Sequence, residues 1–133
     1  MNYEDRLNEI RQELWHYDLS NIFNLDETGL FYNQLPLKSY SIEGEQCFVQ
    51  IKKQRVTIML CCNALGESFQ PVVVGKMSAK KVSSKYAYFQ NKTAWMNSKL
   101  FQYILCGWND RLKAIGRNIL IITVISVGIL FNP

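Results

Sequence analysis

The sequence contains few of the residues that build metal or disulfide sites. Among its 133 residues there is one histidine, His16, and the four cysteines include no C-x-x-C pair. His16 has no partner at metal-ligand spacing, so no zinc site is expected, and we interpret it as an ordinary residue at a helix end. No secretory signal is recognised, and Cys61 and Cys62, adjacent on a predicted strand, should point to opposite faces. We therefore expect reduced core thiols in an intracellular protein.

A hydrophobic run long enough to cross a membrane is also missing. The only candidate, residues 119–131, is thirteen residues long and is interrupted by Thr123, Ser126 and Gly128, whereas a bilayer core requires about twenty apolar residues. No membrane partner is therefore predicted. The length, the apolar fraction of 48% and the charged fraction of 20% are typical of one globular domain rather than of a disordered chain.

Acidic residues are almost absent from the middle of the chain. Residues 1–45 hold nine acids and three bases, but residues 46–100 hold nine bases and Glu67 as the single acid. A basic block of this kind favours a polyanionic partner, because each phosphate that is neutralised releases condensed counterions. The alternative is a solvated basic surface that serves only solubility.

The segment 24–30, with the sequence NLDETGL, places an acidic pair at the end of an apolar run. We predict a short buried strand that ends near Leu25 and a turn at Gly29. A carboxylate at the end of a rigid strand, here Asp26, is well placed to bind a divalent cation, because Mg²⁺ prefers one or two fixed carboxylates plus waters. An acidic turn without a metal ion is the alternative.

Further short motifs follow this segment in a characteristic order. They are Pro36, Gly44, KQRVT at 53–57, CNA at 62–64 with Gly66, PVVVGK at 71–76, AWM at 94–96 and Phe101. With DETGL at 26–30, and over roughly residues 15–123, the sequence resembles the DDE superfamily endonuclease domain of pogo/Tigger/jerky-type transposases. That family also gave rise to centromere-protein-B-like DNA-binding proteins.

We predict an α/β fold, a partial ribonuclease-H-like domain with a mixed sheet of about four strands and flanking helices. The expected elements are an amphipathic helix at 3–16, strands ending at 25 and spanning 55–63, 69–74 and 118–123, and a turn at 64–67. Residues 76–92 should form a loop or an edge segment. A second helix, capped by Thr93 or Asn97, should run to about residue 115 and end at Gly116. The resemblance implies that the first and the last strand are neighbours.

Three regions follow from this reading. Residues 1–18 are a helix that precedes the core, residues 19–123 are the partial domain, and residues 124–133 are an aberrant tail. The bases that encode VISVGI at 124–129 can read Asp-Asn-Phe-Ser-Gly-His when one adenine is restored in the first codon. The tail is therefore a candidate frameshift or gene-model error, and a coincidence of codon degeneracy is the alternative.

The resemblance implies a centre of two Mg²⁺ ions held by several carboxylates, of which Asp26 would be the first, both catalytic and metal-binding. The second acid should follow the last strand in an Asp-Asn-x-x-x-His motif. Val124 stands at that position instead, and no acid follows Asp110. Glu27 is no substitute, because it should point to the opposite face of the strand from Asp26. We therefore expect that Mg²⁺ is not productively bound and that the chain is not an active nuclease.

Six basic residues are candidate contacts to the phosphate backbone of DNA. They are Lys52, Lys53, Arg55, Lys76, Lys80 and Lys81, although solubility alone is an alternative role. The main hypothesis is a nuclear DNA-binding fragment of a transposable-element-derived DDE endonuclease without cleavage activity. The alternatives are a domesticated, non-catalytic chromosomal DNA-binding protein and a remnant without function. Binding should be weak and non-specific, because no helix-turn-helix module is recognised before the first strand.

Aromatic residues are concentrated between positions 86 and 108. Exposed rings in a basic segment can stack on bases. Helical spacing nevertheless favours core packing for the last four of them, which are Trp95, Phe101, Tyr103 and Trp108.

Overall fold

The computed structural model describes residues 2–32, 54–78, 84–123 and 129–130. Its elements, in chain order, are α1 (Tyr3–Leu14), a 3-10 helix (Leu19–Asn21), β1 (Ile22–Phe31), β2 (Arg55–Asn63), β3 (Val72–Gly75), β4 (Ala87–Gln90), α2 (Ser98–Ala114), β5 (Leu120–Thr123) and β6 (Ile129–Leu130). The predicted α/β class is confirmed. Neither helix in this part of the chain is long and apolar enough to span a bilayer.

The strands form one sheet in the order β4-β3-β2-β1-β5-β6. β1 pairs antiparallel with β2 and parallel with β5, so the first strand and the strand after α2 are neighbours, as predicted. The sheet has six strands rather than about four. β4 forms the edge beside β3 within the segment predicted as a loop or an edge, and the short β6 pairs with β5. This mixed sheet is consistent with a partial ribonuclease-H-like fold.

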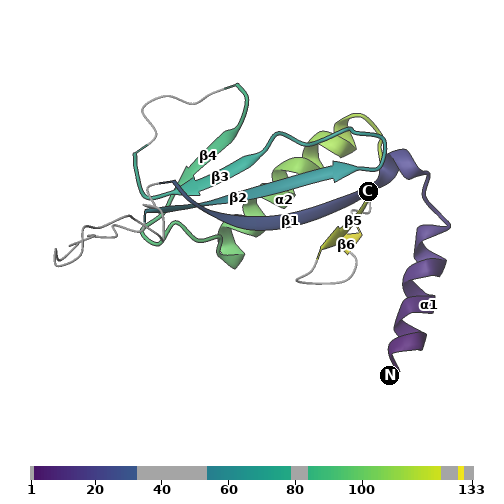
Figure 1. Cartoon of the computed structure of the whole chain (residues 1–133). Helices are drawn as coiled ribbons and strands as arrows, with labels where there is room; N and C mark the ends of the chain where they lie inside the picture. Colours follow the sequence, from purple (N-terminus) through teal and green to yellow (C-terminus); the bar gives the residue numbers. More distant parts are fainter. Residues whose placement is uncertain (1, 33–53, 79–83, 124–128, 131–133) are drawn as a thin grey trace.

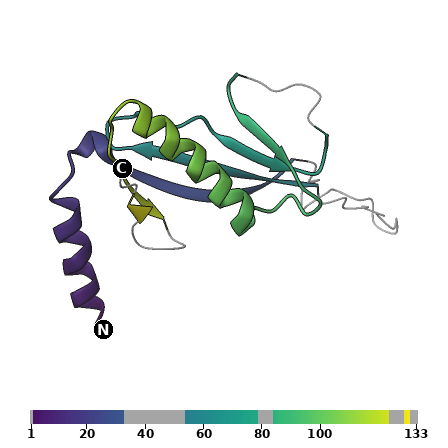
Figure 2. The same ribbon diagram turned by 180° about the vertical axis from the view of Figure 1, so that it is seen from behind.

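α2 packs on one face of the sheet and encloses the core (Figures 1 and 2). Figure 1 shows this helix behind the strands, and Figure 2, turned by 180°, shows it in front of them. Alternate residues of β1 and β2 point towards α2 and are buried, among them Phe23, Leu25 and Met59. The residues between them point to the other face, where Leu60 is 49% exposed. The sheet therefore has one packed face and one open face.

The ends of α2 are set by local chemistry that the sequence reveals. Asn97 caps the helix, because its side-chain oxygen accepts a hydrogen bond of 2.9 Å from the backbone N–H of Leu100. Gly116 follows the helix with a φ of 65°, a left-handed conformation that glycine adopts without strain. The buried side of α2 consists of Ile104, Leu105, Trp108 and Leu112.

Two of the four aromatic residues predicted for the core lie there. The ring of Trp108 stacks on that of Phe69 with centroids 4.4 Å apart, and Phe101 packs against the buried cluster. The prediction is wrong for Trp95 and Tyr103, which are 55% and 68% exposed. Trp95 precedes the first residue of α2, so helical periodicity does not apply to it. The Tyr103 ring packs edge-to-face against that of Phe89 on β4, with centroids 6.0 Å apart, but stays largely exposed.

The predicted turn at Gly29 is also wrong, because β1 continues through it to Phe31. The ladder with β2 extends from Phe23 to Phe31, and Gly29 is paired with Thr57. A Cβ atom at position 29 would lie 2.8 Å from Cζ of Arg55. Glycine therefore makes room inside the strand for the guanidinium group of Arg55 rather than turning the chain.

α1 forms as predicted but ends two residues earlier than expected. Its first turn has a capping box, in which Asn2 accepts from the backbone and the side chain of Asp5 accepts from the N–H of Asn2. The apolar stripe is only half-buried, and no residue of α1 is fully buried. Both views show α1 standing away from the sheet (Figures 1 and 2).

The described cysteines are free thiols, but only one of them lies in the core. Cys61 is buried and Cys62 is exposed, which confirms that they point to opposite faces. Burial, with a smaller effect of Cys62, raises the pKa of the Cys61 thiol to about 12. Cys106 is exposed on α2, so the expectation of core thiols is wrong for Cys62 and Cys106. Cys47 lies outside the described residues.

Candidate nucleic-acid interface

Asp26 lies beside the carboxyl end of β5. The parallel register between β1 and β5 ends with the pair Leu25 and Thr123, and Asp26 is the next residue of β1. Its side chain is on the open face of the sheet and is exposed. One of its oxygens, Oδ1, accepts a hydrogen bond of 2.8 Å from the backbone N–H of Glu27. The sheet therefore brings Asp26 next to the strand after which the resemblance expects a second acid.

Glu27 points to the other face of the sheet, towards α2, and is half-buried. Its Oε1 is buried and has no hydrogen-bond partner within the described residues. Desolvation by burial, followed by the neighbouring charge of Asp26, raises the pKa of the Glu27 carboxyl. The two adjacent acids therefore do not converge on one site.

Within residues 2–32, 54–78, 84–123 and 129–130, no group of three or more His, Cys, Asp or Glu side chains is placed to hold a metal ion. Asp26 is the one carboxylate that these residues bring to the open face beside β5. Two divalent ions need more negative charge than one carboxylate supplies, so this part of the chain does not by itself fit a two-metal centre. Val124 lies outside the described residues.

Arg55 and Lys76 come together in one pocket, although they lie 21 positions apart in the sequence. This basic pocket has a volume of about 320 Å³ and is lined by Phe31, Tyr32, Gln54, Arg55, Lys76, Thr93 and Trp95. Arg55 starts β2, and Lys76 follows the last residue of β3. Neither base forms an ion pair with another described residue. The pocket thus gathers two cationic and three aromatic side chains.

The guanidinium group of Arg55 lies between a strand and an aromatic ring. Its Cζ is 3.1 Å from the centroid of the Trp95 ring, and its other side faces the backbone of Gly29. Nη2 lies 3.5 Å from Oγ1 of Thr57, a long contact. Nε is buried and has no partner among the described residues. Among the described residues, Arg55 is therefore held in place mainly by stacking, and its terminal nitrogens make one long contact.

Trp95 is aimed at Arg55 by a tight turn before α2. The side-chain oxygen of Asn91 accepts from the backbone N–H groups of Thr93 and Ala94, at 3.1 and 2.6 Å. Ala94 is fully buried and has a φ of 59°, which strains a residue with a side chain. Its carbonyl oxygen accepts a bond of 2.7 Å from the hydroxyl of Thr57. The turn is thereby fastened to β2 next to Arg55.

The sequence-predicted site residues fall into separate places. Arg55 is paired with Phe31, which lies five residues after Asp26 on β1. Five residues of a strand span roughly 17 Å, so this is about the separation of Asp26 and Arg55 along the strand direction. They also lie on opposite faces of the sheet, because successive side chains alternate. Arg55 and Lys76 form a common site, from which Asp26 is distant. The other four basic candidates, Lys52, Lys53, Lys80 and Lys81, lie outside the described residues.

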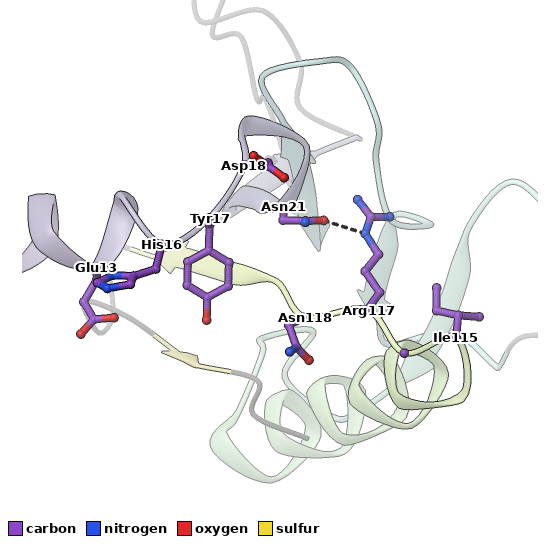
Figure 3. Close-up of a pocket in the computed structure, with 9 residues that line it drawn as sticks. Glu13, His16, Tyr17, Asp18, Asn21, Ile115, Arg117 and Asn118 are labelled. Atoms are coloured by element: carbon purple, nitrogen blue, oxygen red, sulfur yellow. Dashed lines mark hydrogen bonds between the residues drawn. The ribbon is translucent and has the colours of Figure 1, made fainter.

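A larger, open hollow of about 840 Å³ lies at the other end of β1, between the end of α1 and the turn after α2 (Figure 3). Its charged lining consists of Glu13, Asp18 and Arg117. His16 is part of the wall, where its Nδ1 lies 2.8 Å from the carbonyl oxygen of Gln12. Two acids and one base do not suit a polyanion, so the basic pocket is the better candidate for nucleic acid.

Arg117 is fully engaged by its neighbours. Its Nε donates to the side chain of Asn21 at 2.8 Å, as Figure 3 shows, and Nη2 donates to the carbonyl oxygen of Ser20 at 2.8 Å. Both terminal nitrogens also donate to the carboxylate of Glu67. The hydrogen bond from Arg117 is the main reason why the pKa of Glu67 is lowered. This network ties the start of β1 to the β2–β3 turn and to the segment before β5.

A mixed sheet whose first strand carries an acid beside a late parallel strand, with a helix packed on one face, defines a ribonuclease-H-like α/β domain. The chain belongs to the DDE superfamily endonuclease family, whose model matches residues 53–124. That match includes Arg55, Lys76 and Trp95, and it begins after Asp26.

Proteins derived from transposable elements are among the similar sequences. Tigger transposable element-derived protein 4 of Mus musculus is 33% identical over 112 residues, which cover 79% of this chain and 22% of that protein. CENP-B homolog protein 2 of Schizosaccharomyces pombe is 31% identical over 130 residues, which cover 90% of this chain and 25% of that protein. Protein PDC2 of Saccharomyces cerevisiae is 34% identical over 127 residues, with coverages of 77% and 13%. The chain spans a quarter or less of these relatives. No solved structure matches it significantly.

Proposed function

We propose that this chain is a nuclear, DNA-binding part of a transposable-element-derived DDE protein, and that it binds the phosphate backbone without cleaving it. The observation that carries the proposal is the convergence of Arg55 and Lys76 on one pocket. Neither base is neutralised by an acid among the described residues. Two such cations fixed at one place attract a polyanion more strongly than the same charges dispersed over a surface.

Further basic residues are close in sequence to those that line the pocket. Lys52 and Lys53 directly precede Gln54 of the pocket, and Lys80 and Lys81 follow Lys76 by four and five positions. Lysine acts as a point charge towards phosphate, whereas arginine can donate two parallel hydrogen bonds. A site of this composition should bind DNA non-specifically, with a Kd on the order of 10⁻⁴–10⁻⁶ M at physiological salt.

The proposed lack of cleavage is supported by the residue that follows β5, which is not an acid, so Asp26 has no second carboxylate there. By the resemblance of residues 26–30, Asp26 would be the first metal-binding acid, both catalytic and a ligand of Mg²⁺. Val124 occupies the place of the second acid. We therefore assign Asp26 as an inherited metal-binding position that does not form a productive centre in this chain.

The test is DNA binding measured at several salt concentrations, followed by incubation of plasmid DNA with Mg²⁺ or Mn²⁺. The logarithm of the binding constant should fall linearly with the logarithm of the salt concentration, and Lys76→Ala should make the slope shallower by about one. An affinity that does not depend on salt would contradict the proposal of backbone binding.

Plasmid nicking is the second readout. No nicked product is expected with either metal ion. Nicking that disappears in Asp26→Asn would show a working metal centre and would overturn the assignment of a non-cleaving protein. Nicking that persists in Asp26→Asn would come from a contaminating nuclease, and it would leave the salt-dependent binding as the measurement that decides.

A further inference from the structure

We infer that the basic pocket binds one unpaired nucleotide of a DNA strand, with the phosphate at Arg55 and Lys76 and the base stacked on Trp95. The inference rests on the proposed DNA binding and specifies which form of DNA the site prefers. Backbone binding alone requires cations, whereas this pocket also presents three aromatic rings. Its volume of about 320 Å³ is within the range of sites that enclose small ligands.

The three rings come from two separate segments and are all accessible. Phe31, the last residue of β1, is 41% exposed, and Tyr32, which follows it, is 50% exposed. Trp95, before α2, is 55% exposed. Aromatic faces stack on any base, which adds affinity without sequence preference. Inside a duplex the faces of each base are covered by its neighbours, so a base reaches such a ring only when it is unpaired or extruded. The pocket is therefore suited to single-stranded or locally opened DNA.

Arg55 is placed to bind the phosphate of the nucleotide. Stacking on Trp95 fixes the plane of its guanidinium group, while Nε lacks a partner among the described residues and Nη2 has only a long contact to Thr57. Because Nε is buried, a phosphate oxygen would bind at the terminal nitrogens of the guanidinium group, and hydrogen bonds to a charged acceptor are among the stronger ones in proteins. Lys76, just after β3, adds a second positive charge at the pocket.

Trp95 is held ready for stacking by the strained turn before α2. The left-handed conformation of Ala94 persists because both of its backbone polar groups are bonded. Its N–H donates to the side chain of Asn91, and its carbonyl oxygen accepts from the hydroxyl of Thr57. Strain of this kind persists only where the surrounding structure over-determines the conformation, and strained residues cluster at functional sites. A ring that is already positioned loses little conformational entropy when a base stacks on it.

The experiment compares two single strands of the same length, an oligodeoxythymidylate and a strand whose central nucleotides are abasic. Both carry the same phosphates, so only stacking distinguishes them. The protein should bind the base-bearing strand roughly tenfold more tightly than the abasic one. Trp95→Ala should reduce this ratio to about one, whereas Lys76→Ala should weaken both strands alike.

A matched control is Trp15→Ala, because Trp15 is 88% exposed and lies just after α1, outside the pocket. It should keep the full preference for the base-bearing strand. The melting curve of Trp95→Ala, followed by circular dichroism, should match that of the unaltered protein, because the Trp95 ring is half exposed. In a Trp15→Phe background, the remaining tryptophans are Trp95 and the buried Trp108, so a change in emission on DNA binding reports on Trp95. This emission should be quenched by the base-bearing strand and not by the abasic one.

Equal affinity for the two strands, or a preference that survives in Trp95→Ala, would overturn the inference of base stacking. Salt-dependent binding to both strands would in that case still support the proposed function. If neither strand binds at any salt concentration, both proposals fail. The two ideas therefore fail in different ways, and the abasic strand separates them.

Discussion

Two arginines at opposite ends of β1 make opposite use of the same chemical group. Arg117 donates hydrogen bonds to Asn21, Ser20 and the carboxylate of Glu67, and its Cζ lies 5.6 Å from the centroid of the Phe23 ring. Arg55 lies much closer to an aromatic ring, 3.1 Å from that of Trp95, but it has one long hydrogen bond and a buried Nε without a described partner.

The contrast separates a structural arginine from one that is available for a ligand. A guanidinium group whose donors are all bonded within the chain stabilises the fold, because removing it leaves its acceptors without partners. A guanidinium group held by stacking keeps its donors for an acceptor from outside, and its removal should leave the fold largely unchanged. Each of the following predictions tests one side of this difference.

The largest effect is expected for Arg117→Ala, which removes the bonds between the start of β1, the β2–β3 turn and the segment before β5. Loss of several charged hydrogen bonds should lower the free energy of unfolding by about 3 kcal/mol, as measured by urea denaturation. Arg117→Lys should recover only part of the loss, because lysine lacks the forked geometry. A loss below about 1 kcal/mol in Arg117→Ala would place Arg117 in the same class as Arg55.

Arg55→Ala should show the reverse pattern. The affinity for DNA should fall roughly tenfold at moderate salt, because a positioned charge is lost from the pocket, and the free energy of unfolding should change by less than about 1 kcal/mol. Fluorescence anisotropy and urea denaturation measure the two quantities. Arg11→Ala on α1 removes the same charge away from the pocket and should leave the affinity almost unchanged. If Arg11→Ala weakens binding as much as Arg55→Ala, net charge rather than the pocket controls affinity.

The next effect comes from Gly29→Ala, which keeps every charge but disturbs the position of Arg55. The added methyl group would lie within 2.8–3.0 Å of the guanidinium atoms, and the guanidinium group should move off the Trp95 ring, because a side-chain end yields more easily than backbone. We expect a several-fold loss of DNA affinity and a change in unfolding free energy below about 1 kcal/mol. Unchanged affinity would mean that stacking on Trp95 is not needed to position Arg55.

The sequence predicts those parts of the fold that local signals or the resemblance specify. Asn97, Gly116 and the apolar spacing between them indicate α2, and the resemblance implies that β1 lies beside β5. The role of Gly29 is not readable from its own segment, because it depends on Arg55, which is opposite Phe31 on the neighbouring strand. A glycine inside a strand that makes room for another side chain has the same local sequence as a glycine in a turn.

The basic pocket could be predicted only in part. The sequence indicates Arg55 and Lys76 as candidate phosphate contacts, but helical spacing, extended beyond the start of α2, wrongly predicts Trp95 in the core. The residues NKT at 91–93 carry a turn signal, since Asn and Thr side chains often bond to the backbone two or three positions ahead. The network of Arg117 has no such signal, because its partners lie 50 to 97 positions away.

The smallest effect concerns acid stability, and it arises only at the Arg117 end of the sheet. The pKa of Glu67 is lowered in the fold, so its ion pair with Arg117 stabilises the protein at neutral pH. This contribution is fully present above the ordinary pKa of glutamate, and it is lost as the pH falls through the lower pKa of the folded state. Because Glu67 is about half exposed, solvent screening should keep the loss modest.

Thermal melts between neutral pH and pH 3 should therefore fall less steeply in Glu67→Gln than in the unaltered protein, and Arg55→Ala should follow the unaltered protein throughout. Glu27 acts in the other direction. Its pKa is raised, so the cost of keeping it charged is relieved on acidification, and this relief is common to all three proteins. Parallel curves for Glu67→Gln and the unaltered protein would mean that the Arg117 network stabilises through its neutral acceptors alone. The comparison of the two arginines would then depend on hydrogen bonding and not on charge.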